Sequence, residues 1–284
     1  MRIWVHRYEL VPKRRLSEVA RPGARSGALL RIGDGFADVH PWPELGDAPL
    51  DEQLALLARG ELTPLTRASL HHAQIDGDAR KRGVSLFEGL KIPESHWPGP
   101  DPPPEFDTVK LKGLQPFPEN VRLRIDFNAT LTPDEFLRIA QTLPRERIDF
   151  IEDPCTYDAE TWEALRTATN LRLALDLAAT GSRPQATPFD VLIHKPAINS
   201  EFPDFTGEIV VTSYMDHPIG QFTAAYVAAT HNVSPRCGLM THVLYEPDAF
   251  IERIQRDGAR LLPPRGTGIG LDDLLENLPW KLLQ

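Results

Sequence analysis

Short β-rich runs recur between residues 108 and 196, and each run ends at or beside a charged residue. The runs read TVKLK, RLRID, IDFIED, LRLALD and VLIHKP. Stretches typical of helices separate some of them, at residues 133–143 and 159–168, and a further one follows at 218–230. Strands that alternate with helices predict a parallel sheet, whose functional side chains lie at the carboxyl ends of the strands. The sequence therefore predicts an α/β fold with a (β/α) TIM-type barrel.

The predicted barrel has fewer outer helices than a regular one. A standard eight-unit barrel uses about 250 residues, and residues 107–271 fall well short of that length. Only residues 113–120 separate the KLK and RLRID runs, and only 198–206 separate HKP from EIVVTSY. Both linkers are rich in Pro, Gly, Asn or Asp, which favour turns. We expect irregular crossovers there in place of helices.

The first ninety or so residues predict a small α+β unit. Alternating runs indicate strands at 3–8, 28–32 and 35–39. One helix should begin near Leu50, and another at Thr63-Pro64, where Thr suits the N-cap and Pro the first turn. Six prolines between residues 92 and 107 exclude a continuous helix and mark the predicted junction. We expect a capping domain at residues 1–92 and a catalytic barrel with a carboxyl-terminal segment at 93–284.

The overall charge limits the classes of partner. A formal net charge of −9 argues against binding to nucleic acid or to an anionic membrane surface, since both need a concentrated basic surface. The start, MRIWVHRYEL, resembles a strand more than a signal peptide, and no run approaches the ~18 apolar residues of a membrane span. We therefore expect a cytoplasmic protein. The short cluster Lys13-Arg14-Arg15 indicates a solvated loop, although loop cations can also attract an anionic substrate.

Three acids end consecutive predicted strands and indicate a metal site. Asp126, Glu152 and Asp176 should lie around one point in a barrel. Unpaired carboxylates in a cleft repel one another unless a cation neutralises them. Hard oxygen ligands favour Mg²⁺, with Mn²⁺ as a possible substitute.

Lysines stand on both sides of this trio. Lys112 ends the strand before the acids and Lys195 follows the strand after them, while Lys110 shares a strand face with Lys112. A metal acidifies the α-proton of a bound carboxylate, and a lysine beside other cations can remove that proton near neutral pH. The arrangement predicts proton abstraction next to a small carboxylate substrate.

The motifs, taken in order, resemble those of the muconate-lactonizing branch of the enolase superfamily. They are KLK at 110–112, RIDFN at 124–128, IEDPC at 151–155, ALD at 174–176 and HKP at 194–196. Within that branch the chain resembles the o-succinylbenzoate synthase family, on RLRIDFN, IEDPC, TSYMDHPIGQ at 212–221 and GFADVHPWPELGD at 35–47. The amino-terminal unit resembles the capping domain of these proteins.

That resemblance implies a reaction and residue roles. The reaction is the Mg²⁺-dependent syn dehydration of 2-succinyl-6-hydroxy-2,4-cyclohexadiene-1-carboxylate to 2-succinylbenzoate, in menaquinone biosynthesis. Lys112 would be the base that returns the proton to the departing hydroxide, and Lys195 would stabilise the enediolate. The metal ligands would be Asp126, Glu152 and Asp176, and the substrate-binding residues Lys110, Arg124, Asn128 and Ser213. One departure is Leu177, where family members often carry an acid.

Two other functions remain open at this stage. An N-acylamino acid racemase or dipeptide epimerase uses the same metal trio with both lysines as acid–base groups. Dipeptide epimerases, however, carry an Asp-x-Asp pair on the last barrel strand, and it is missing from residues 260–271, where we expect that strand. A non-catalytic relative that binds a metal or ligand is the other alternative. The sequence leaves the oligomeric state undetermined.

The residues outside the motifs carry weaker expectations. Arg25, His40 and Trp42 are placed in cap loops that either close over the substrate or pack as ordinary loops. His71 and His72 are expected on a solvent-exposed helix face.

Overall fold

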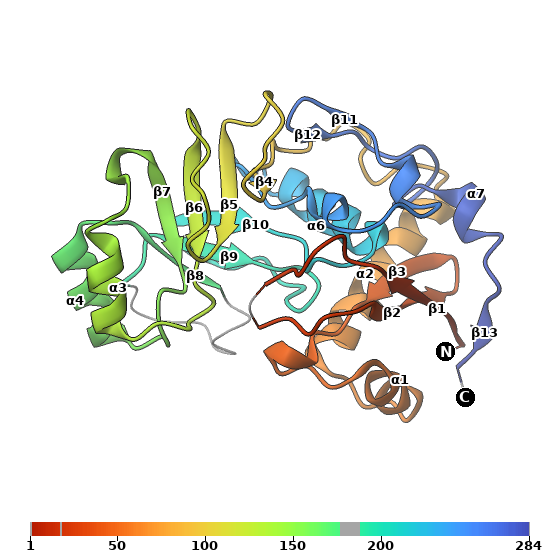
Figure 1. Cartoon of the computed structure of the whole chain (residues 1–284). Helices are drawn as coiled ribbons and strands as arrows, with labels where there is room; N and C mark the ends of the chain where they lie inside the picture. The colour runs from red at the N-terminus through yellow and green to blue at the C-terminus, as the bar shows by residue number, and fades with distance from the viewer. Residues whose placement is uncertain (1, 18, 177–187, 284) are drawn as a thin grey trace.

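The computed structural model describes residues 2–17, 19–176 and 188–283. A curved parallel sheet with two helices beside it forms one side of the molecule, and an antiparallel sheet with two helices forms the other (Figure 1). The chain termini lie close together beside the antiparallel sheet (Figure 1). No helix in these ranges is both long and apolar enough to cross a bilayer.

The amino-terminal unit is a four-stranded antiparallel sheet with two helices. The strands run in the order β13-β1-β2-β3, with β1 at Ile3–Leu10, β2 at Arg25–Ile32, β3 at Gly35–Val39 and β13 at Lys281–Leu282. The helices are α1 at Leu50–Ala58 and α2 at Pro64–Lys81. The predicted strands and both helix starts are confirmed. Helix α2 begins with the Thr63 cap, whose hydroxyl accepts a hydrogen bond from the backbone N–H of Thr66.

The chain returns to this unit at its end. Strand β13 pairs antiparallel with β1, with Trp4 opposite Leu282. The carboxyl-terminal strand therefore completes the amino-terminal sheet, although the predicted barrel domain extended to residue 284. The domain boundary near residue 92 remains a prediction.

The barrel consists of seven parallel strands in sequential order. They are β4 at Trp97–Pro98, β5 at Thr108–Lys112, β6 at Arg122–Asp126, β7 at Ile148–Glu152, β8 at Leu173–Asp176, β9 at Val191–His194 and β10 at Glu208–Val211. The register aligns strand ends, with Lys112 opposite Asp126 and Asp126 opposite Glu152. Apolar residues such as Val109, Leu123 and Ile151 are fully buried, as expected for strands covered on both faces. The predicted TIM-type barrel is confirmed.

A short segment around Cys237 closes the barrel. The Cys237 carbonyl accepts a hydrogen bond from His96 N, next to β4, at 2.9 Å, and Gly238 N donates to Val211 O of β10 at 2.9 Å. The last barrel position is thus at residues 237–239, and the sequence-based placement of that strand within 260–271 was wrong. Residues 256–261 instead form a separate two-stranded hairpin, β11 at Arg256–Asp257 and β12 at Arg260–Leu261.

The outer layer of the barrel is reduced, as predicted. Helix α3 (Pro133–Ala140) follows β6, α4 (Ala159–Thr169) follows β7 and α6 (Pro218–Thr230) follows β10. Within the described ranges, no helix joins β5 to β6 or β9 to β10. Helix α6 contacts both β10 and β3, and Phe222 of α6 shares a buried core with Phe36 of β3. Apolar packing therefore attaches the amino-terminal unit to the barrel.

Short elements complete the chain. They are the 3₁₀ turns η1 at Pro43–Leu45, η2 at Arg145–Arg147, η3 at Thr241–Leu244 and η4 at Ile251–Arg253, and the helix α7 at Asp272–Leu275. Two of them, η1 and η3, lie close to the site described next.

Candidate active site

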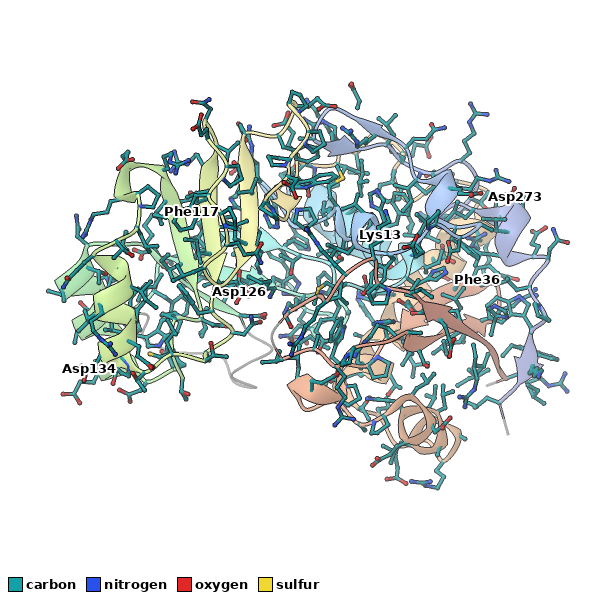
Figure 2. All side chains as sticks on the ribbon, viewed as in Figure 1. Lys13, Phe36, Phe117, Asp126, Asp134 and Asp273 are labelled. Carbon is teal, nitrogen blue, oxygen red and sulfur yellow. The ribbon has the colours of Figure 1, made fainter. Side chains whose placement is uncertain are left out.

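Charged side chains from neighbouring strand ends meet at one place. The Lys110 ammonium lies 3.0 Å from Asp126 Oδ2 and 2.6 Å from Glu152 Oε1. Lys112 Nζ lies 2.5 Å from Asp126 Oδ2. All four side chains are largely shielded from solvent. Asp126 lies in the middle of the molecule, where the barrel faces the amino-terminal unit (Figure 2).

The next two strands extend this cluster. Lys195, which follows β9, forms an ion pair with Asp176 at the end of β8. The parallel register explains the meeting, because the carboxyl ends of successive strands lie at one edge of the sheet. The sequence-predicted lysines therefore lie on both sides of the acids around one centre.

The electrostatics of the cluster keep two of the lysines charged. Burial alone lowers the pKa of Lys110, but the carboxylates of Asp126 and Glu152 more than offset it, and the pKa rises above its usual value. Burial likewise lowers the pKa of Lys195, but the carboxylate of Asp176 more than offsets it, so the pKa of Lys195 also rises. Burial, followed by repulsion from Asp126, raises the pKa of Glu152 to about 7. One acid of the cluster is therefore poorly neutralised by the lysines alone.

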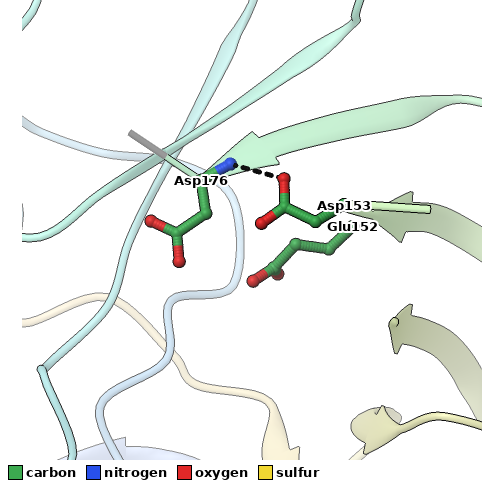
Figure 3. A group of neighbouring side chains, drawn as sticks. All are labelled: Glu152, Asp153 and Asp176. Atoms are coloured by element: carbon green, nitrogen blue, oxygen red, sulfur yellow. Dashed lines mark hydrogen bonds between the residues drawn. The ribbon is translucent and has the colours of Figure 1, made fainter. Parts of the chain in front are cut away.

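Three carboxylates lie close enough together to hold a metal ion. Glu152, Asp153 and Asp176 each offer an oxygen within 4.8 Å of the others, and all three residues are buried. Figure 3 shows them side by side, with Asp176 N donating to Asp153 Oδ1 at 3.2 Å. Glu152 Oε2 is buried without a hydrogen-bond partner in the described part of the chain. An orphaned oxygen among hard anionic donors fits Mg²⁺.

This group differs in one member from the predicted trio. It contains Asp153 in place of Asp126. The Oδ2 atom of Asp126 instead forms ion pairs with both Lys110 and Lys112. Asp153 has a left-handed backbone, with φ of 41°, and its side chain is buried beside that of Glu152. The only sequence signal for it was an acid directly after a strand-end acid. Leu177, the predicted departure from the family pattern, lies outside the described residues.

A cavity of about 420 Å³ opens beside the cluster. Its walls include all three lysines, and Ser213, whose hydroxyl lies 2.6 Å from Thr241 Oγ1, also lines it. The volume suits a small organic ligand. A smaller adjoining space of about 100 Å³ is lined by residues that include Trp42, Asn128, Asp153, Asp176 and Lys195. Asn128 Oδ1 accepts a hydrogen bond from Lys112 Nζ at 3.1 Å.

Arg124 does not line either of these cavities. Its guanidinium is buried inside the barrel, where Nε donates to Asp149 Oδ2 at 2.8 Å and Nη1 donates to the carbonyl of Arg236. The predicted substrate-binding role of Arg124 is therefore corrected to an internal contact. Arg124 shares the inward strand face with Asp126, but its guanidinium is held by Asp149 and the Arg236 carbonyl and does not reach the cavity.

The predicted cap residues Arg25, His40 and Trp42 are all buried. Arg25 begins β2 and forms a buried ion pair with Glu44, 2.6 Å apart, while its guanidinium stacks on Trp42. His40 is 2% exposed and lines neither of these two cavities. Trp42 alone of the three predicted cap residues reaches the site. Of the two possibilities left open for these residues, ordinary packing describes Arg25 and His40.

His72 is also buried, contrary to its predicted exposure. It is 7% exposed, and its Nε2 lies 3.1 Å from the carbonyl oxygen of Pro196. Helix α2 therefore packs against the segment that carries Lys195. His71 is exposed, as predicted.

A contact between cap and barrel that the sequence did not indicate involves Tyr214. Its hydroxyl donates to Asp47 Oδ2 at 3.0 Å, and its carbonyl accepts a hydrogen bond from Trp42 Nε1 at 2.8 Å. The ring faces the Lys195 ammonium, 5.4 Å from its centre. Tyr214 thus joins the cap segment around η1 to one of the site lysines.

Comparison with known proteins agrees with this geometry. Residues 3–79 match the family model for the O-succinylbenzoate synthase N-terminal domain. The o-succinylbenzoate synthase of Bdellovibrio bacteriovorus is 34% identical over 98% of this chain and 97% of that protein.

Solved structures share the fold at low identity. The L-Ala-D/L-Glu epimerase from Bacillus subtilis superposes with a TM-score of 0.75 at 16% identity, over 95% of this chain and 98% of that one. A dipeptide epimerase from Cytophaga hutchinsonii, solved with Mg and the dipeptide D-Ala-L-Val, gives 0.74 at 13% identity, over 100% and 99%. An enolase-superfamily protein from Listeria innocua gives 0.75 at 13% identity, over 99% and 98%.

The capped barrel is the fold that this chain shares with these enolase-superfamily and epimerase structures, and here it carries lysines and acids at successive strand ends. The structural neighbours establish only the fold. The near full-length relative assigns the subgroup: this chain belongs to the o-succinylbenzoate synthase family.

Proposed function

We propose that this chain is a lyase that dehydrates 2-succinyl-6-hydroxy-2,4-cyclohexadiene-1-carboxylate to 2-succinylbenzoate. The observation that carries the proposal is that Lys112 and Lys195 line one cavity beside the buried acids, in a chain 34% identical to an o-succinylbenzoate synthase. The product would serve menaquinone biosynthesis, and we place the enzyme in the cytoplasm.

Lys112 is the proposed base. Asp126 and Asn128 hold its nitrogen at 2.5 and 3.1 Å, which fixes the side chain without enclosing it, since 23% of it is exposed toward the cavity. Neutral Lys112 removes the proton α to the ring carboxylate, and the electron pair left behind forms the enediolate. The resulting ammonium then gives a proton to the departing hydroxide on the same face. The ring becomes aromatic, and one water leaves for each substrate converted.

Lys195 has a different proposed task. Its pairing with Asp176 and its position over the Tyr214 ring favour a permanently protonated ammonium. A fixed cation at this place stabilises the negative charge that develops on the substrate carboxylate. Lys195 need not exchange a proton during dehydration.

The acids provide the proposed metal site. Glu152 and Asp176 belong to both the predicted trio and the close carboxylate group, so we assign them as ligands, with Asp126 or Asp153 as the third. A bound Mg²⁺ would supply charge that acidifies the α-proton. Lys110 forms ion pairs with both Asp126 and Glu152, which holds these two side chains next to each other.

Racemization of N-acylamino acids is the alternative to be tested, because it needs the same groups. It requires Lys195 to transfer protons on the second face, whereas the geometry holds Lys195 against Asp176. The last barrel position and the residues after it, CGLMTH at 237–242, contain no Asp-x-Asp pair, so the corrected strand assignment still disfavours a dipeptide epimerase.

Metal removal tests the proposal. Protein treated with a chelator should form no aromatic product from the cyclohexadiene carboxylate, and added Mg²⁺ or Mn²⁺ should restore its formation. The assay follows the ultraviolet absorbance of the product. Full activity in metal-free protein would refute the role of the acids.

A further inference from the structure

The cations that line the main cavity fall into two groups. The lysines 110, 112 and 195 lie at the strand ends and are each paired with a carboxylate. Arg14 and Arg15 line the same cavity from the loop after β1, and Arg15 Nε donates to the carbonyl of Ala20 at 3.4 Å. Within the described part of the chain, Arg14 makes no hydrogen bond or ion pair with a protein group. Arg14 therefore brings to the cavity a positive charge that no group in the described part of the protein neutralises.

The turn after β4 makes room for this guanidinium. Gly99 has φ of +136°, a conformation that other residues rarely adopt. A Cβ atom at Gly99 would lie 2.2 Å from Arg14 Nη2. A residue without a side chain thus allows the Arg14 head to lie directly against the backbone of the cavity wall.

The loop that carries Arg14 is attached on both sides. Before it, Pro12 pairs with Tyr245, and Lys13 N donates to Leu244 O at 2.9 Å. After it, Leu16 is buried in a core that includes Trp42 and Tyr245. Fixed flanks reduce the ordering cost when the guanidinium binds a ligand.

The proposed substrate carries two carboxylates at opposite ends. The ring carboxylate reacts at the lysines and acids. The carboxylate of the succinyl chain has to lie elsewhere in the cavity, beyond walls that Leu16, Pro98, Pro116 and Leu244 make largely apolar. A guanidinium can bind a carboxylate through two parallel hydrogen bonds, and this suits Arg14 for the second end.

We infer that Arg14, seated over Gly99, forms a second anion subsite that binds the succinyl carboxylate and so selects dicarboxylate substrates. This inference rests on the proposed function. It makes Arg14 a binding and specificity residue that takes no part in proton transfer.

The test compares two ligands that differ only at the far end. These are 2-succinylbenzoate and 2-butanoylbenzoate, in which a methyl group replaces the distal carboxylate. Calorimetric Kd values are measured in the presence of Mg²⁺ for wild type, Arg14→Gln and Arg14→Lys. Lys13→Gln is the matched control, because it removes one charge from the same loop at an exposed residue outside the cavity lining.

The Arg14→Gln variant should bind 2-succinylbenzoate about tenfold more weakly, as expected for one charge-assisted contact at a partly exposed site. Its Kd for 2-butanoylbenzoate should stay within about twofold of wild type. Arg14→Lys should lie between, because it keeps the charge and loses the planar fork. For turnover, KM should rise about tenfold with kcat nearly unchanged.

Three results would overturn the subsite: unchanged binding of 2-succinylbenzoate by Arg14→Gln, an equal loss for both ligands, or a wild type that binds neither. A wild type that discriminates the ligands through Arg14 yet forms no aromatic product would refute the proposed dehydration and leave the subsite supported.

Discussion

Replacing each cavity lysine by arginine separates a proton-transfer role from a purely electrostatic one. Lys112 contacts Asp126 and Asn128, and Lys195 contacts Asp176 and the Tyr214 ring. Arginine keeps the positive charge at both positions. It cannot lose a proton at working pH, so only a lysine that acts as a base is disabled by the change.

The expected losses differ in size. General acid–base catalysis contributes about 10²–10⁴-fold, so Lys112→Arg should lower kcat for dehydration by at least that factor. Lys195→Arg keeps a cation beside Asp176, although its side chain is only 13% exposed and the larger head must displace its neighbours. Loss of a stabilising group outright costs about 10²–10³-fold, and a retained cation should limit the loss to roughly 10–100-fold.

The assay follows aromatic product under saturating substrate, with Mg²⁺ affinity measured for each variant. Metal binding separates loss of chemistry from loss of the site, because both lysines contact acids of the cluster. Comparable activity of Lys112→Arg and wild type would refute the assignment of the base. Equal inactivity of both variants, with metal bound, would show that Lys195 also transfers a proton.

Two further predictions concern the cap. Tyr214→Leu should lower kcat about tenfold or more through loss of the ring beside Lys195, whereas Tyr214→Phe keeps the ring and should recover most of the activity; equal kinetics of the two variants would contradict a positioning role. The hydrogen bond from Arg25 lowers the pKa of Glu44 to about 2 from an ordinary value near 4.5. Because the folded-state pKa is depressed, this pair stabilises the fold above about pH 4.5, and its contribution of about 2 kcal/mol, after allowance for solvent screening, is lost as pH falls toward 2. Urea unfolding of wild type and Glu44→Gln should show a difference that is largest near pH 6 and shrinks toward pH 3, and a difference independent of pH would refute the link.

Local patterns were sufficient to predict the strands and the charges at their ends. Runs such as RLRID and VLIHKP carry both their β-propensity and their terminal acid or lysine within a few residues. A parallel sheet then brings the strand ends together without further information. The signal for the start of α2 is local in the same way, because Thr63 is the N-cap and Pro64 is the first residue of the helix.

The features that were mispredicted depend on contacts between distant segments. The barrel closes through residues 237–239, a short irregular segment with no strand pattern, held by partners at His96 and Val211. His72 is buried where α2 packs against the segment after Lys195. Arg124 likewise owes its environment to Asp149 and Arg236, neighbours that no local pattern identifies. Asp153 joins the acid group through a left-handed backbone that the sequence does not reveal.

The measurement that tests the account most directly offers the purified wild type two substrates side by side in D₂O with Mg²⁺. One is 2-succinyl-6-hydroxy-2,4-cyclohexadiene-1-carboxylate and the other is an N-acylamino acid, and both are followed by proton NMR. The proposed mechanism predicts rapid formation of 2-succinylbenzoate, with a kcat/KM well above that for α-deuterium exchange of the amino acid. Rapid exchange and racemization of the amino acid, without aromatic product from the first substrate, would contradict it.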